Sequence, residues 1–159
     1  MPVPMATESS EVAPEATQTP FPASTKQAAS IIKGIHTDIM TVQFADKIII
    51  TVTQGGGLAQ WIHVPLDTQN PNYADQHTQV DLDEGGLLPM SHLTATTVLG
   101  GTMPERETVG QLYATQLASA VATKNPEETR LVVVGLGLQK AAMDRDTFFE
   151  VVELALQCL

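Results

Sequence analysis

The stretch from Thr37 to Pro65 decides the fold, and its centre is Lys47-Ile48-Ile49-Ile50-Thr51-Val52-Thr53-Gln54. Apolar and polar residues alternate through much of it and β-branched residues are frequent, a pattern typical of β-strands. Gly55-Gly56-Gly57 then supplies backbone freedom for a reversal into Leu58 to Pro65. We predict three strands in quick succession, joined as a meander with a hairpin turn at the glycines. Such a sheet offers surfaces and edges to partners, and the stretch carries almost no side chain suited to chemistry.

The chain around this stretch divides into one domain and a tail. Residues 1–26 hold five of the ten prolines and show no hydrophobic periodicity. Because such a segment buries too little apolar surface to offset its ordering entropy, we predict a disordered tail over 1–26 and a domain over 27–159. Within the domain, residues 67–92 contain five acids and no Lys or Arg, with Asn70-Pro71-Asn72 and Gly85-Gly86 as breakers. This pattern indicates a long, flexible, acidic loop.

The remaining elements complete the fold class. We predict a first short strand at Ser30 to Ile35, a strand at Leu93 to Leu99, and a helix that starts at Pro104 with Thr102 as N-cap. Its expected buried stripe, in steps of three and four, is Val109, Leu112, Tyr113, Leu117, Ala120 and Val121.

The last part of the chain is expected to be a strand and a helix. Leu131 to Leu138 is apolar throughout, except for its glycines, so this strand should be central and covered on both sides. Asp144 or Asp146 should cap a last helix. The sequence predicts an α+β fold: a mainly antiparallel sheet of about six strands with two helices, in one layer-packed domain.

Composition excludes several classes of function. The chain has 159 residues and a formal net charge of −10, from 18 acids and 8 bases. This charge argues against nucleic acid and anionic membrane surfaces as partners. No apolar run approaches the roughly 18 residues of a membrane span, and the start of the chain lacks a signal-peptide layout. With Cys158 as the single cysteine, we expect a reducing compartment, the cytoplasm or the nucleus. Charged residues are only 16% of the chain, which hints that part of its surface is covered.

Motifs for catalysis are weak. Gly135-Leu136-Gly137 lacks the third glycine of a dinucleotide-binding turn, and Gly55-Gly56-Gly57 lacks the lysine of a phosphate-binding loop. The four histidines are scattered without ligand spacing, and Cys158 is better explained as an apolar filler than as a nucleophile. We therefore predict that the chain is not an enzyme and has no catalytic, cofactor-binding or metal-binding residues.

Several strings, taken in order, resemble the proteasome assembly chaperone 3 family. They include Gly34-Ile35, Thr37 to Phe44, Ile48 to Gln54, the strand end at Gly100, the helix start at Pro104-Glu105, Leu131 to Leu138 and the closing helix. The similarity spans about Lys26 to Leu159, and the proline-rich tail and the acidic loop depart from the family pattern. The resemblance implies a non-enzymatic chaperone for assembly of the 20S proteasome α-ring. It also implies a heterodimer with a chaperone 4-like subunit, or a homodimer, that binds α-subunits transiently.

Two hypotheses follow for how partners are recognised. Asp81, Asp83 and Glu84 could face a basic patch on the partner chaperone or on an α-subunit, or they could simply keep a loop in water. Two copies that each carry −10 repel, so self-association should be the weaker mode. Two alternatives stay open at this point: a longin- or roadblock-like adaptor of a trafficking complex, and a small nucleotide-binding enzyme.

Overall fold

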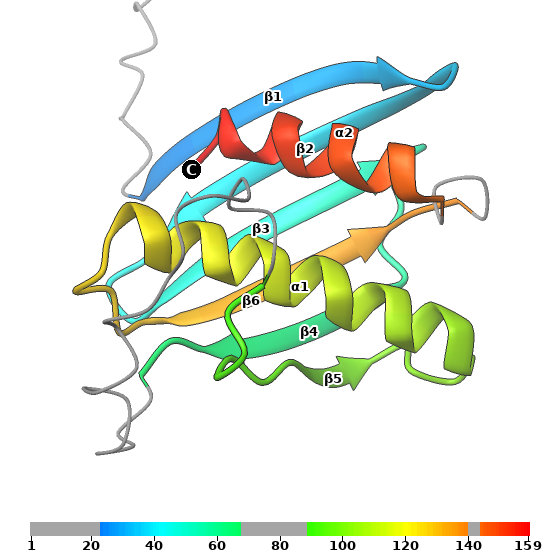
Figure 1. Ribbon diagram of the computed structural model, residues 1–159. Helices are drawn as coiled ribbons and strands as arrows, with labels where there is room; N and C mark the ends of the chain where they lie inside the picture. Colours follow the sequence, from blue (N-terminus) through cyan, green and yellow to red (C-terminus); the bar gives the residue numbers. More distant parts are fainter. Residues whose placement is uncertain (1–22, 68–88, 140–143) are drawn as a thin grey trace, which may run out of the picture.

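The computed structural model describes residues 23–67, 89–139 and 144–159, which form one six-stranded sheet with two helices on one of its faces (Figure 1). The strands are β1 (Ser24–Ile32), β2 (Ile35–Gln43), β3 (Lys47–Gln54), β4 (Gln60–Pro65), β5 (Thr96–Leu99) and β6 (Leu131–Gly137). The helices are α1 (Pro104–Lys124) and α2 (Arg145–Leu156). This confirms the predicted α+β class, with six strands and two helices.

The order of the strands corrects the predicted meander. The sheet runs β1-β2-β3-β6-β4-β5, so β6 lies between β3 and β4. It pairs in parallel with β3 and antiparallel with β4, whereas every other neighbouring pair is antiparallel. The glycines at 55 and 56 do reverse the chain, with φ of 76° and 80°, but the predicted hairpin is wrong. The connection instead spans the width of one inserted strand, about 10 Å between β3 and β4.

The physical reason for this order is the composition of β6. From Val132 to Gly137 every residue is buried, and a central position provides both ladder partners and cover. The prediction that this strand is central is therefore confirmed. Gly137 allows a close approach, because a Cβ at this position would lie 1.6 Å from the carbonyl oxygen of Gly57.

The first strand also differs from its prediction. β1 begins at Ser24, so Ser24, Thr25 and Lys26 pair with β2 although the tail was predicted to extend through residue 26. The strand predicted from Ser30 to Ile35 ends at Ile32, because Lys33 and Gly34 form a turn there with φ of 48° and 80°. Residues 1–22 lie outside the described part of the chain.

Helix α1 lies across the sheet and buries a broader face than the predicted stripe. Its buried residues are Gly110, Tyr113, Ala114, Gln116, Leu117, Ala118, Ser119 and Val121. Leu112 is 45% exposed, which corrects its place in the stripe. Small residues bring the helix close to the sheet, since a Cβ at Gly110 would meet Ile62 Cδ1 at 3.0 Å. Met103 occupies the N-cap position without a side-chain hydrogen bond, so the predicted cap at Thr102 is wrong.

Helix α2 packs against β1, β2 and α1. Asp144 is its N-cap, and its carboxylate accepts a hydrogen bond of 2.7 Å from the Thr147 amide. The shared core lies between the two helices and the sheet, around Tyr113, Leu117, Ile50 and Val134. The loop predicted at 67–92 is described only at Asp67 and at residues 89–92, and the strand predicted from Leu93 starts at Thr96.

Candidate interaction surface

The most distinctive functional feature is the side of the sheet that the two helices leave uncovered. Side chains on β3 alternate: Ile48, Ile50 and Val52 are buried beneath the helices, and the residues between them are only partly buried. The same alternation runs through β2 and β4. We call the uncovered side the open face. Its apolar side chains include Met40, Val42, Phe44, Ile49, Trp61, Leu99, Leu131 and Val133.

The strand register places these side chains in rows across the open face. One row contains Val42, Ile49, Val133 and His63, which are partners on successive strands β2, β3, β6 and β4. The next row, read the same way, is Met40, Thr51, Gly135, Trp61 and Leu99. Because these positions come from five separate strands, the sequence pattern alone did not group them.

Trp61 is the largest side chain of the open face, and it lies against Gly135. A Cβ at residue 135 would meet the Trp61 ring carbons at 3.0 and 3.1 Å, and Leu58 Cδ2 at 3.3 Å. The glycine therefore gives the indole a place on the sheet that a larger residue would fill. Trp61 keeps part of its surface exposed, as expected of an aromatic anchor at an interface.

Exposed apolar side chains accompany the tryptophan. Met40 is 36%, Phe44 38% and Leu99 63% exposed. The character changes toward the other ends of β2 and β3, where Asp38 and Thr53 are partners and His36 Nδ1 lies 2.9 Å from Asp38 Oδ2. The open face thus combines an apolar area with a polar end, which is the composition of a protein interface.

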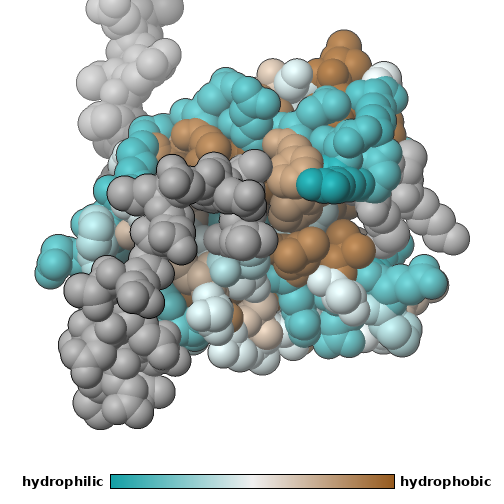
Figure 2. Space-filling model, viewed as in Figure 1, coloured by the Kyte–Doolittle hydropathy of each residue, from teal (hydrophilic) through white to brown (hydrophobic). Residues whose placement is uncertain are grey.

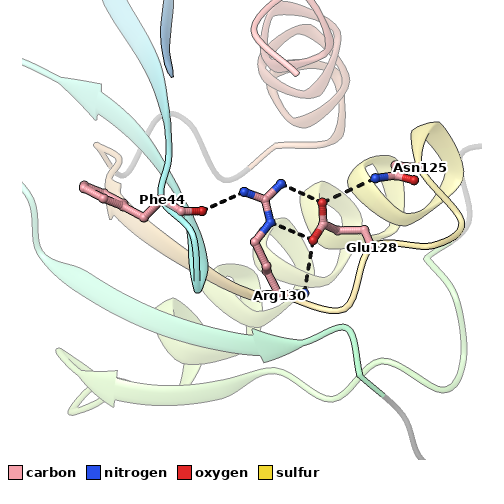
Figure 3. A network of polar contacts seen from close by, with 4 residues as sticks. All are labelled: Phe44, Asn125, Glu128 and Arg130. Carbon is pink, nitrogen blue, oxygen red and sulfur yellow. Dashed lines mark hydrogen bonds and ion pairs between the residues drawn. The ribbon is translucent and has the colours of Figure 1, made fainter. Parts of the chain in front are cut away.

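A polar network holds the turn that presents Phe44 (Figure 3). Arg130 Nη1 donates a hydrogen bond of 2.7 Å to the carbonyl oxygen of Phe44. The same guanidinium donates two further bonds of 2.7 Å to the carboxylate oxygens of Glu128. The Phe44 ring points away from the network in Figure 3. The ion pair therefore fixes the backbone of the β2–β3 turn and leaves the ring available.

Electrostatics stabilise this network. The side chain of Glu128 is only 7% exposed, and hydrogen bonds from the Arg130 guanidinium lower the pKa of its carboxyl to about 2. The pKa of Arg130 is raised by the same contact. Both groups stay charged at neutral pH, so the turn is held by a bidentate ion pair.

Figure 2 shows the opposite side of the molecule, which carries the two helices. Hydrophilic residues dominate its outline, and hydrophobic surface shows between them. The exposed large apolar side chains of the helices are Leu112 and Leu156, at 45% and 48%. They come from different helices and do not form part of a strand row.

Within the described residues no arrangement suited to catalysis or metal binding stands out. No group of three or more His, Cys, Asp or Glu side chains could hold a metal ion in that part of the chain. Burial raises the pKa of the Cys158 thiol, which disfavours the reactive thiolate. Gly135 and Gly137 lie at close contacts rather than at a phosphate-binding turn. No helix that the structure describes has the length and apolar character to span a membrane.

The residues predicted as a partner contact lie outside the part of the chain that the structure describes. Asp81, Asp83 and Glu84 fall in the range 68–88, outside the described residues. The low charged fraction of the sequence indicated a covered surface but did not identify the residues that form it. The alternating strand patterns could have shown which residues share a face, but the sheet order was needed to set the strands side by side.

The fold and this surface define a class of protein: a two-layer α+β domain with an apolar sheet face that its helices leave uncovered. The chain matches the family described as Proteasome assembly chaperone 3 over residues 50–155. It therefore belongs to that family, and its role lies in proteasome assembly. The family assignment favours the chaperone resemblance over the two alternatives, the trafficking adaptor and the small nucleotide-binding enzyme.

Comparison with solved structures gives a match to a chain in "Crystal Structure of a Novel Chaperone Complex for Yeast 20S Proteasome Assembly". The two chains are 14% identical with a TM-score of 0.48, and the match covers 85% of this chain and 95% of that one. A search of the curated proteins gives no match.

Proposed function

We propose that this chain is a non-enzymatic chaperone that helps to assemble the α-ring of the 20S proteasome. In this proposal it acts in the cytoplasm or nucleus as a dimer with a chaperone 4-like subunit and binds α-subunits transiently. The observation that carries the proposal is the open face, on which Trp61, Met40, Phe44 and Leu99 expose apolar surface. Exposed apolar surface framed by polar residues marks sites of protein contact.

The partner proposed for the open face is the chaperone 4-like subunit rather than a second copy. A second copy would bring another net charge of −10 to the contact. A partner of lower negative charge avoids this repulsion, which acts over a Debye length of about 10 Å at 0.1 M salt. The family match supports the wider role, and the charge argument favours the heterodimer.

The experiment that tests the dimer compares two charge insertions. Leu99→Arg places a cation beside Trp61 on the open face, whereas Leu112→Arg places one on the exposed side of α1. We expect Leu99→Arg to abolish co-purification of the chaperone 4-like subunit, because an interface core excludes unpaired charge. Leu112→Arg should leave it unchanged. If both variants lost co-purification, or if neither did, the proposal that the open face is the contact would be contradicted.

The role in α-ring assembly is tested in cell extract. A tagged chain should co-purify α-subunits of the proteasome but not the mature particle, since a chaperone that leaves after assembly needs only intermediate affinity. An extract in which the tagged chain pairs with its chaperone partner but never with α-subunits would overturn this part of the proposal.

The acidic positions Asp81, Asp83 and Glu84 remain a separate hypothesis. Charge reversal at all three should weaken capture of a basic partner at low salt and change little at high salt. Capture that is unaffected at low salt would leave only the alternative, in which these acids solvate the chain.

A further inference from the structure

The two edges of the sheet are built differently. β5 has four residues, and its pairing with β4 shifts register between Trp61 and Ile62. β1 has nine residues, pairs with β2 in unbroken antiparallel register, and contains no proline. Short, irregular edges resist the addition of another strand, whereas long, regular ones invite it. β1 is therefore the edge open to strand addition.

The backbone of β1 has N–H and C=O groups that point away from the rest of the sheet. In an antiparallel pair, every second residue of an edge strand directs its N–H and C=O away from its partner. Seven of the nine β1 residues are exposed, one is partly buried, and only Ile32 is buried. An added strand would meet few obstacles there.

A hollow of about 190 Å³ lies between this edge and α2. It is lined by Ser30 and Ile32 of β1 and by Glu150, Glu153, Leu154 and Gln157 of α2. In Figure 1, α2 runs along the helix side of β1. Side chains of a strand added to β1 would alternate, and every second one would enter the space beside α2.

The charges around the hollow select the kind of strand that fits. Glu150 and Glu153 are exposed and are one turn apart on α2, so they share a side of the helix. Of the nearby bases, Lys33 hydrogen-bonds to Asp144 and reaches Glu150 only through weaker charge attraction, and the Arg145 guanidinium lies 5.4 Å from the centre of the Phe149 ring. Asp146 adds a further acid at the start of the helix.

We propose that the edge of β1 together with α2 is a docking site for an extended segment of a partner protein that carries Lys or Arg at alternate positions. The segment adds to β1 as a seventh strand, and its basic side chains lie against Glu150 and Glu153. This site is separate from the open face and does not depend on the heterodimer proposed there.

The test uses a fluorescein-labelled peptide of about eight residues, long enough to span most of β1, in which Lys alternates with Thr and Val. Binding to the full chain is measured by fluorescence polarisation. We expect the double variant Glu150→Gln/Glu153→Gln to weaken binding about tenfold at low salt, as two exposed ion pairs allow. Glu105→Gln/Glu127→Gln removes the same charge from exposed positions outside the hollow and should leave binding unchanged.

Strand addition is separated from simple charge attraction by methylating peptide nitrogens. A strand that pairs through one edge uses the N–H groups of alternate residues only. Methylation of one alternate set should therefore abolish binding, and methylation of the other set should spare it. Equal binding of both methylated peptides, or no binding of the parent peptide, would overturn the proposal. The chaperone dimer is assayed separately, so its failure would not be confused with failure of this site.

Discussion

Gly137 occupies a position in the sheet where there is no space for a larger residue. A Cβ here would lie 1.6 Å from the Gly57 carbonyl oxygen and 2.7 Å from its carbonyl carbon, and backbone cannot move aside as a flexible side chain can. We predict that Gly137→Ala lowers the free energy of unfolding by about 2–3 kcal/mol, the cost of forcing atoms into a packed site. Urea denaturation of purified protein measures it.

The matched control is Gly57→Ala, on the other side of the same contact. A Cβ at residue 57 would have no heavy atom within 4 Å. Its free energy of unfolding should stay within about 0.5 kcal/mol of the parent, as for most surface substitutions. Equal losses in the two variants would show that the cost arises from backbone freedom rather than from the contact.

Glu128 gives a prediction for pH. Its carboxyl pKa is lowered from 4.5 to about 2 in the folded chain, first by hydrogen bonds from the Arg130 side chain. A depressed folded pKa stabilises the fold fully above pH 4.5 and loses that contribution as the pH falls toward 2. Replacement by Gln should therefore destabilise the fold by about 1 kcal/mol at pH 7, because solvent screens the partly exposed Arg130, and by much less near pH 2. Unfolding curves at both values test this, and a constant difference between parent and variant would contradict it.

Among the elements, the positions of the strands along the chain were better predicted than the order in which the strands pair in the sheet. Val132 to Leu136 is apolar on both faces, and this alone identified β6 as central. The same reasoning did not insert β6 between β3 and β4, because the glycines at 55–57 are as compatible with a tight hairpin as with a wider reversal. Strand order is set by which pairing buries the most apolar surface, and that is a property of the whole sheet.

For the helices too, one property was predictable from the sequence and another was not. The start of α1 at Pro104 followed from local signals. Its buried face did not, because Ala114, Ala118 and Gly110 pack closely while the larger Leu112 faces outward. The open face was missed for the same reason: burial of β3 side chains on one side depends on where the helices lie.

The contacts between the β1–β2 turn and the start of α2 allow a prediction about how α2 is stabilised. Asp144 caps α2 through the Thr147 amide and pairs with Lys33 of the turn. Asp144→Asn keeps a capping oxygen and loses the ion pair, whereas Asp144→Ala loses both. We expect the thermal midpoint, followed by circular dichroism, to fall in the order parent, Asn, Ala. Lys33→Gln should have the same thermal midpoint as Asp144→Asn, because both variants lose only the ion pair. If Asp144→Asn were as unstable as Asp144→Ala, the cap would contribute little.

At the scale of the molecule, two surfaces are available for two kinds of contact. The open face exposes apolar side chains around Trp61, and the β1 edge beside α2 offers backbone groups and carboxylates. The first suits a lasting contact, because burial of apolar surface is the dominant favourable term in most protein association. The second suits a reversible contact, because exposed ion pairs are weak and screened.

The last prediction follows from the net charge and concerns the association of the whole chain with a second copy. Two copies repel at low salt because each carries −10, and screening at high salt relieves this repulsion. Self-association, measured by sedimentation, should therefore strengthen from about 0.02 M to about 0.5 M salt, as the Debye length falls from roughly 20 Å to roughly 4 Å. The pair with a less acidic chaperone 4-like subunit should change far less. A tight homodimer whose affinity is the same at both salt concentrations would contradict the charge argument and favour the open face as a self-association surface.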